Sequence, residues 1–236
     1  MSHIYRKRAN TKQQIIRLAS KLFIEEGYEN TSLTKIAKLL DISTGNITFY
    51  FSTKEHLLAV LVDELFRFQA MLMERYVHEG KSSLLAYCLE LTSIAAACEE
   101  DLVARDFYCA VYSSALTLDM IRQNDTEKTK NVFSAFRPDW TEQQWISTED
   151  IVSGIEYATI RPDGHNTPLE VRIENALNTI LWLYGVPKEL RQAKIQKVLS
   201  MDYRSLGTGI LSTFREYIDN ATEENNMLVI PKEDEI

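Results

Sequence analysis

The stretch from residue 11 to residue 58 constrains the fold more than any other part of the chain, because it holds three short helical patterns and the start of a fourth. Apolar residues recur there at intervals of three and four, the spacing of a helix with one buried face. Gly27 is placed to end the first helix, and Asp41, which tolerates a left-handed backbone, is placed to turn the chain before the third. Two short helices joined by a tight turn and supported by a preceding helix form a helix-turn-helix arrangement.

Polar residues mark where the first two helices begin. Thr11 and Gln14 form a capping box, which predicts that the first helix starts there. Thr31 or Ser32 is placed to cap the second helix.

The third helix, predicted over residues 44–51 and capped by Ser43 or Thr44, has an unusual outward face. Its inward face consists of Ile47, Tyr50 and Phe51. The other positions are Thr44, Asn46, Thr48 and Phe49. They include small polar side chains suited to base edges and phosphates, which a helix buried in a core would not need. We therefore interpret this helix as one that enters the major groove of DNA.

These residues resemble the DNA-binding domain of the TetR family of bacterial repressors over residues 10–58. The resemblance rests on the string FIEEGY, the pair Ile36-Ala37, Gly45, the aromatic pair Tyr50-Phe51 and the lysine at position 54. Two positions depart from the usual family pattern. Asp41 stands where a turn glycine is common, and Thr48 replaces the usual phosphate-contacting tyrosine, with an aromatic residue beside it at Phe49.

The resemblance implies a set of DNA-contacting residues at the start of the second helix, along the third helix and just after it. Lys54 is expected to contact a phosphate, and Thr44 and Asn46 are expected to face bases. The full predicted set is Ser32, Thr34, Lys35, Thr44, Gly45, Asn46, Thr48, Phe49, Tyr50 and Lys54.

The charge distribution agrees with a DNA-binding head. Residues 1–60 carry nine Lys or Arg against five Asp or Glu, whereas residues 61–236 carry seventeen against twenty-nine. Only the N-terminal part is therefore suited to a polyanion. The basic run Arg6-Lys7-Arg8 is either a solvated tail or an arm that contacts phosphates.

The rest of the chain has helical periodicity throughout, which predicts an all-α protein. A chain of 236 residues leaves room for a second, larger core behind the head. We expect a helix-turn-helix domain over residues 1–51, a helical ligand-binding and dimerisation domain over 52–221, and a polar tail over 222–236. A helix predicted over 102–122 is apolar nearly all round and should be central.

A small-molecule pocket in the second domain is implied by the resemblance. Its candidate lining residues are Tyr87, Cys88, Leu91, Phe107, Tyr108, Tyr112, Trp145, Tyr157 and Trp182. The alternative for each of them is an ordinary core position with a hydrogen-bonded tip. Asp106 and Glu156 lie near apolar stripes, where they would meet a cationic ligand group or a neighbouring arginine.

Two late amphipathic segments bear on oligomerisation. Their stripes are Leu169, Ile173, Ala176, Leu177, Ile180 and Tyr184, and Leu206, Ile210, Phe214 and Tyr217. The resemblance implies that such helices pair in a twofold homodimer. The alternative is that each stripe is buried within its own protomer.

Other classes of function find little support in the sequence. The three cysteines are too far apart for one zinc site and are expected to be free buried thiols. No phosphate loop or nucleophile elbow is present, so we predict no enzyme, no cofactor and no metal. No apolar run reaches the length of a membrane span, which favours a cytoplasmic protein.

The sequence therefore predicts a homodimeric TetR-like regulator, a repressor that leaves a palindromic double-stranded DNA operator when a small molecule binds its second domain. Two alternatives remain. One is a DNA-binding regulator controlled by a protein partner, and the other is an all-α enzyme that carries a helix-turn-helix domain.

Overall fold

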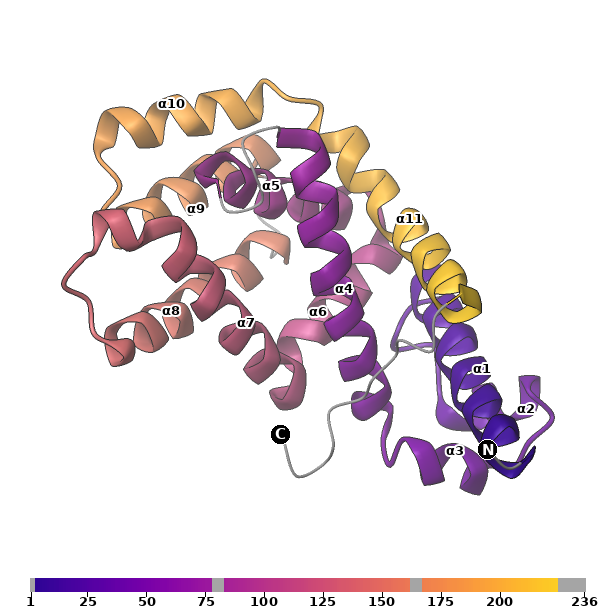
Figure 1. The fold of residues 1–236 in the computed structure, drawn as a ribbon. Coiled ribbons are helices and arrows are strands. Elements are labelled where there is room, and N and C mark those ends of the chain that lie inside the picture. Colours follow the sequence, from indigo (N-terminus) through magenta and orange to yellow (C-terminus); the bar gives the residue numbers. More distant parts are fainter. Residues whose placement is uncertain (1–2, 78–82, 162–166, 225–236) are drawn as a thin grey trace.

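The computed structural model describes residues 3–77, 83–161 and 167–224, which form helices and no strand (Figure 1). The all-α prediction is confirmed. The elements are α1 (His3–Glu25), α2 (Leu33–Leu39), α3 (Thr44–Tyr50), α4 (Lys54–Val77), α5 (Leu84–Glu100), α6 (Leu102–Ser113), α7 (Ala115–Phe133), the 3-10 turn η1 (Ser134–Phe136), α8 (Glu142–Ile160), α9 (Leu169–Leu183), α10 (Lys188–Leu199) and α11 (Tyr203–Glu224).

Helices α1 to α3 form the head, and local signals set most of their ends. Gly27 has φ +95° and Asp41 has φ +53°, so both predicted left-handed turns are confirmed. The predicted start of α1 at Thr11 is wrong, because α1 begins at His3. Residues 3–10 contain neither proline nor glycine, so nothing in them stops the helix from extending backwards. The backbone of the Arg6-Lys7-Arg8 run belongs to α1, but its side chains lie outside the described part of the structure.

The body is built around α5, which contacts every helix from α4 to α11. Its side chains from Leu85 to Cys98 are buried on nearly all sides, with Glu90 half-buried. The prediction of a central helix over 102–122 is wrong. The chain is extended at Ser114, with φ −79° and ψ 127°, so α6 ends there and α7 continues to Phe133. Serine hydroxyls compete for backbone hydrogen bonds, so the Ser113-Ser114 pair favours a break in the helix.

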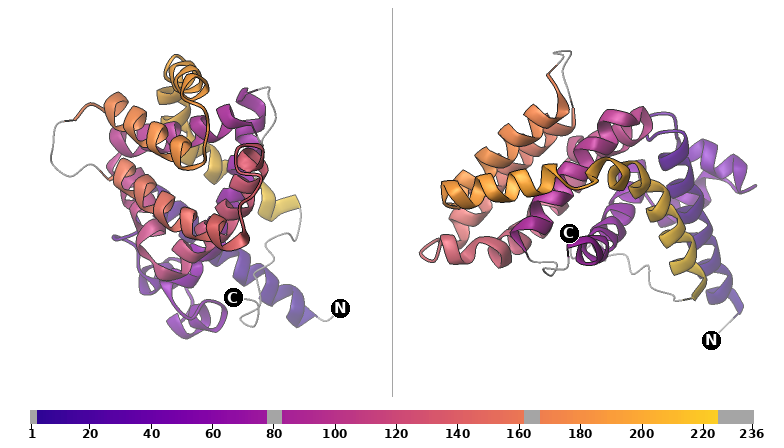
Figure 2. Two further views of the ribbon diagram at one scale, coloured as in Figure 1. Left: turned by 90° about the vertical axis from the view of Figure 1, so that its left-hand side faces the viewer. Right: turned by 90° about the horizontal axis from the view of Figure 1, so that it is seen from above.

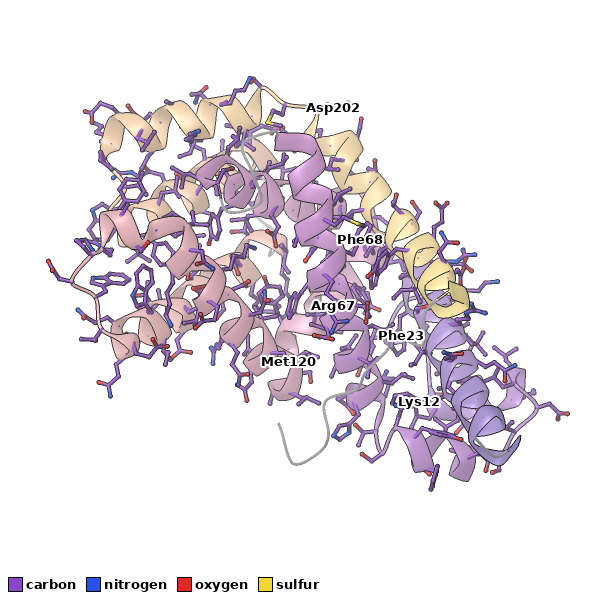
Figure 3. The ribbon with its side chains drawn as sticks, in the orientation of Figure 1. Lys12, Phe23, Arg67, Phe68, Met120 and Asp202 are labelled. Atoms are coloured by element: carbon purple, nitrogen blue, oxygen red, sulfur yellow. The ribbon has the colours of Figure 1, made fainter. Side chains whose placement is uncertain are left out.

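Helix α11 connects the body to the head. It crosses α5 and then runs beside α1, as the right-hand view of Figure 2 and the packing contacts agree. At the crossing, a Cβ on Gly207 would lie 2.4 Å from the Ser93 carbonyl oxygen, so only glycine fits. Phe68 of α4 faces α11 (Figure 3), and its ring centroid lies 5.5 Å from that of Phe214.

The two late apolar stripes are covered within the protomer. The α9 stripe from Leu169 to Tyr184 is buried, and Leu206, Ile210 and Phe214 of α11 are at most 9% exposed. These residues therefore do not offer a dimer interface, which corrects the sequence-based expectation. They face α5 and its neighbours, because amphipathicity alone does not specify what covers the apolar face.

Candidate nucleic-acid interface and interior polar cluster

Helix α3 has one face anchored in the head and one face open. The Ser43 hydroxyl caps it by accepting a hydrogen bond from the Asn46 backbone N–H at 3.2 Å. Ile47 is fully buried and Phe51 is 2% exposed, as predicted for the inward face. The exposed residues are Thr44, Gly45, Asn46, Thr48 and Phe49. Phe49 is 69% exposed and lies edge-on to half-buried Tyr50, with ring centroids 5.1 Å apart.

The start of α2 lies in the same head. Ser32 caps α2 by accepting a hydrogen bond from the Lys35 backbone N–H at 3.1 Å, which selects Ser32 over Thr31. Thr34 is exposed, and the Lys35 ammonium pairs with Glu26. The predicted set on α2 is therefore accessible, although Lys35 already has an anionic partner.

Lys54 has contacts inside the head that the sequence did not indicate. Its ammonium donates a hydrogen bond to the Tyr28 carbonyl oxygen at 3.0 Å. The same nitrogen lies 3.8 Å from the centroid of the Tyr28 ring, a cation–π geometry. Lys54 thus ties the start of α4 to the turn that follows α1.

The head also contacts the body through its outer surface. Asp106 of α6 accepts a hydrogen bond from the Glu29 backbone N–H at 3.1 Å. On the α11 side, Arg215 pairs with Glu25, and Arg17 donates to the Asp219 carbonyl oxygen at 2.9 Å. The partner of Asp106 is therefore a backbone N–H of the head rather than a neighbouring arginine.

Three of the predicted pocket residues meet around one buried carboxylate. The hydroxyls of Tyr87 and Tyr112 donate to Glu156 at 3.4 Å and 3.1 Å. The Tyr157 ring stacks on Tyr112 with centroids 6.2 Å apart. Glu156 itself is 7% exposed. Burial raises the pKa of Glu156 well above its usual range, and the charges of nearby carboxylates add to the effect.

The other predicted pocket residues do not join this group. Trp182 is 61% exposed, so its assignment to an interior pocket is wrong. It falls on the side of α9 opposite the buried stripe. Trp145 packs on Trp140 and Tyr184, and only the ring of Phe133 connects Tyr184 to Tyr87. The remaining members are core residues that are at most 5% exposed, namely Cys88, Leu91, Phe107 and Tyr108.

A second buried carboxylate on α8 was missed from the sequence. Glu149 is 1% exposed and accepts hydrogen bonds from Tyr184 at 2.5 Å and Thr129 at 3.1 Å. Burial, with help from the charge of Asp125, raises its pKa to about 7. A signal was present, because Glu149 and Glu156 are spaced by seven residues within the buried stripe that includes Trp145 and Val152.

A cavity of about 220 Å³ lies elsewhere, where α10 meets α11. It is lined by Leu89, Met201, Asp202, Ser205 and Leu206, and Figure 3 marks Asp202 at this end of the body. None of the predicted pocket residues lines it. Within the described ranges, no helix is long and apolar enough to cross a bilayer, and no group of three potential metal ligands was found.

The fold and the exposed face of α3 define a helix-turn-helix DNA-binding head attached to an all-α body. Residues 15–61 match the family model described as bacterial regulatory proteins, tetR family. The head therefore belongs to the TetR family, and the resemblance seen in the sequence is confirmed.

Two curated relatives match the same region. The HTH-type transcriptional regulator QacR of Staphylococcus aureus is 44% identical over 48 residues, which cover 20% of this chain and 26% of QacR. The probable HTH-type transcriptional regulator YttP of Bacillus subtilis is 37% identical over 59 residues, which cover 25% of this chain and 28% of YttP. The matches thus span only about a quarter of each relative's length.

Two solved structures align with most of the chain at low similarity. A gamma-butyrolactone receptor (ArpA like protein) aligns with a TM-score of 0.43 and 18% identity, covering 89% of this chain and 99% of the receptor. The TetR family protein CprB from S. coelicolor A3(2) aligns with a TM-score of 0.37 and 17% identity, covering 89% and 98%. Similarity at this level supports no conclusion about the body.

Proposed function

We propose that the protein is a homodimeric transcriptional regulator that binds a palindromic operator through α3 and releases it when a small molecule binds the body. The observation that carries the proposal is the exposed polar face of α3, held by the buried Ile47 and Phe51 in a TetR-type head. The side chains at the N-terminal end of such a helix are the ones that reach base edges in the major groove.

Asn46 is the residue we propose to read a base. Its exposed carboxamide offers the paired donor and acceptor that suit an adenine edge. Replacing Asn46 with Ala should cost about 1 to 3 kcal/mol of discrimination at one position of each half-site. A binding-site selection with both proteins measures this change.

Asn131→Ala provides the matched control, because Asn131 is an exposed asparagine of α7 in the body. That variant should select the same sites as the parent protein. If Asn46→Ala also selected the same sites, base reading by Asn46 would be refuted.

We propose that the dimer forms through the outward faces of α8 and α9, which pack against each other. Ile151 on α8 is 56% exposed, and Val171 and Trp182 on α9 are 44% and 61% exposed. Val171 and Trp182 are eleven residues apart, which places them on the same side of the helix. Exposed apolar residues of this size on adjacent helices favour a protein interface.

Sedimentation at micromolar concentration tests this interface. The parent protein should be a dimer, and Trp182→Glu should be a folded monomer with weakened operator binding. Leu102→Glu is the control, because Leu102 is a 72% exposed apolar residue at the start of α6. A monomeric parent protein, or a Trp182→Glu variant that stays dimeric, would contradict the proposal.

We propose that the effector signal reaches the head along α4 and through α6. Helix α6 carries Tyr112 on one side and, through Asp106, holds the backbone after α1. A ligand that binds more tightly when α6 is placed differently must weaken DNA binding. By linkage, bound DNA weakens ligand binding by the same factor, and the coupling free energy is commonly about 1 to 3 kcal/mol.

A further inference from the structure

Two buried carboxylates of α8, those of Glu149 and Glu156, have no cationic partner among the described side chains. The two residues are 1% and 7% exposed. Hydroxyl groups donate to them instead: Tyr184 and Thr129 to Glu149, and Tyr87 and Tyr112 to Glu156. A buried carboxylate without a cation is costly to ionise, so the protonated form is favoured at both positions.

The helices α5, α6, α7 and α9 pack against α8, and each contributes charged or titratable side chains to this region. They are Tyr87 and Glu90 on α5, Tyr112 on α6, Arg122, Asp125 and Lys128 on α7, and Tyr184 on α9. Lys128 pairs with Glu90 and lies 3.9 Å from Asp125. Arg122 pairs with Asp150 at 3.2 Å. Both cations therefore have other anionic partners, and neither forms an ion pair with the two buried carboxylates.

The neighbouring carboxylates make ionisation of this region harder still. Burial raises the pKa of Glu149 to about 7, with help from the charge of Asp125. Burial and the charges of Asp125 and Glu149 raise the pKa of Glu156 well above its usual range. As the pH rises through neutrality, a proton therefore leaves the interior of the body and a negative charge remains there. A proton requires no cavity, so it can bind here without rearrangement of the packed side chains.

Packed aromatic rings join the two buried carboxylates into one unit. Tyr87 lies edge-on to Phe133, with ring centroids 5.2 Å apart. Phe133 in turn stacks on Tyr184, with centroids 4.3 Å apart and planes 4° apart. The side chains that donate to the carboxylates thus also pack α8 against its neighbours. An ionised Glu149 or Glu156 can gain hydration only if α8 moves away from these rings.

Glu156 also connects α8 to the head through α6. The Tyr112 hydroxyl of α6 donates to Glu156 at 3.1 Å. Six residues earlier on the same helix, Asp106 accepts a hydrogen bond from the Glu29 backbone N–H at 3.1 Å. A movement of α8 that hydrates Glu156 removes a partner of α6 and so loosens its hold on the head. A loosely held head loses more conformational freedom when it binds DNA, which weakens the complex.

We propose that Glu149 and Glu156 form a proton switch in the body. With protons bound, α8 packs against the rings and α6 holds the head for operator binding. Loss of the protons as the pH rises releases α8 and weakens operator binding. The inference rests on the proposed operator binding and adds a second signal to which that binding responds.

Amide hydrogen exchange of the full chain without DNA tests the switch at its source. The parent protein is compared at pH 6 and pH 8, with exchange times scaled for the intrinsic pH dependence of the reaction. The amides of α8 should lose protection by roughly tenfold or more at the higher pH, because opening becomes coupled to proton release. Equal protection of α8 at the two pH values would overturn the proposal.

A double variant identifies the carboxylates as the source of this response. Glutamine has the shape of a protonated glutamate and cannot ionise, so α8 should keep its protection at pH 8 in Glu149→Gln/Glu156→Gln. Glu127→Gln, which changes an exposed carboxylate of α7, should respond as the parent protein does. If the double variant does not fold, Glu149→Gln and Glu156→Gln replace it singly. A full response in every folded variant would overturn the proposal.

Operator affinity provides the functional readout. Between pH 6 and pH 8, the parent protein should lose about tenfold in operator affinity, and the double variant less than about threefold. Titration within the head affects both proteins equally, so the difference between them measures the contribution of the body. A double variant with the pH dependence of the parent protein would refute the coupling to DNA binding.

These outcomes separate the switch from the proposed function. A protein that selects an operator with the same affinity at both pH values retains the proposed function and lacks the switch. A protein in which α8 responds to pH through the two buried carboxylates, but which selects no DNA sequence, has the proton site and lacks the proposed function.

Discussion

The head and the body of this protein are specified by different kinds of information. In the head, caps and turns such as Ser32, Ser43 and Asp41 act within a few residues of their own position. In the body, Tyr87, Tyr112 and Glu156 come from three helices and meet only after the chain has folded. Local signals therefore recur in recognisable order and match a family, whereas the interior chemistry of the body depends on tertiary packing.

The largest expected effect concerns the packing of the body. Gly207→Ala should lower the free energy of unfolding by about 1 to 3 kcal/mol, because its Cβ would lie 2.4 Å from the Ser93 carbonyl oxygen and helices α5 and α11 would have to separate. Chemical denaturation of both proteins measures the difference.

Gly209→Ala is the control within the same helix. Nothing lies within 4 Å of a Cβ at Gly209, so alanine should stabilise α11 by about 0.5 to 1 kcal/mol through its helix propensity. Equal effects of the two substitutions would mean that α5 and α11 are not in close contact.

The second prediction concerns pH and distinguishes the body from the head. Burial raises the pKa of Glu149 from its usual 4.5 to about 7, so between these values the native state holds a proton that the unfolded chain has released. The free energy of unfolding should therefore fall as pH rises through this window, by about 1.4 kcal/mol per pH unit for one proton. Above about pH 7, Glu149 should contribute no further slope.

Denaturation curves of Glu149→Gln between pH 5.5 and 7 test this prediction. The slope should be smaller than in the parent protein by about 1.4 kcal/mol per pH unit. Glu127→Gln should leave the slope unchanged. An unaltered slope in Glu149→Gln would show that Glu149 is ionised throughout this range.

The third prediction asks whether Lys54 acts within the head or on DNA. Its contacts with the Tyr28 carbonyl oxygen and ring predict that Lys54→Ala costs about 1 kcal/mol of stability. Thermal denaturation of the free protein measures this loss, with Lys21→Ala, at an exposed position of α1, as the control. An unchanged melting temperature together with weaker binding to all DNA sequences would assign Lys54 to a phosphate instead.

The smallest effect is expected at the turn between α2 and α3. Asp41 has φ +53°. This backbone conformation has a higher free energy for alanine than for aspartate, and glycine adopts it without a penalty. Asp41→Ala should lose about 0.5 to 1 kcal/mol of stability, and Asp41→Gly should lose none. If alanine were tolerated as well as glycine, local backbone signals would matter less in the head than we infer.

The sequence predicted those features that depend on near neighbours. The open face of α3, the turn at Asp41 and the cap by Ser43 at the start of α3 are all present in the structure. The start of α1 and the break at Ser114 were missed, since neither is marked by proline or glycine. Such boundaries depend on competition between nearly equal backbone conformations.

The interior of the body was predicted only in part. Tyr87, Tyr112 and Tyr157 were three of the nine candidate lining residues and lie together in the structure, but Trp182 was placed inside although it is exposed. An apolar stripe indicates burial without specifying the covering element, so α9 and α11 were assigned to an interface although their stripes face their own protomer. Glu149 was overlooked because its burial depends on Thr129 and Tyr184, which approach it from other helices.

The contact of α11 with α1 has a consequence for how the protein is made. Arg215 and Glu25, which pair across this contact, are separated by 190 residues. At about 5 to 20 residues per second, the ribosome adds those residues in roughly 10 to 40 s. During that interval the head has emerged while the surface of α1 that α11 will cover is still bare. The contacts of α1 are therefore completed only after α11 has been synthesised. Chaperones can bind the exposed surface of α1 during that interval.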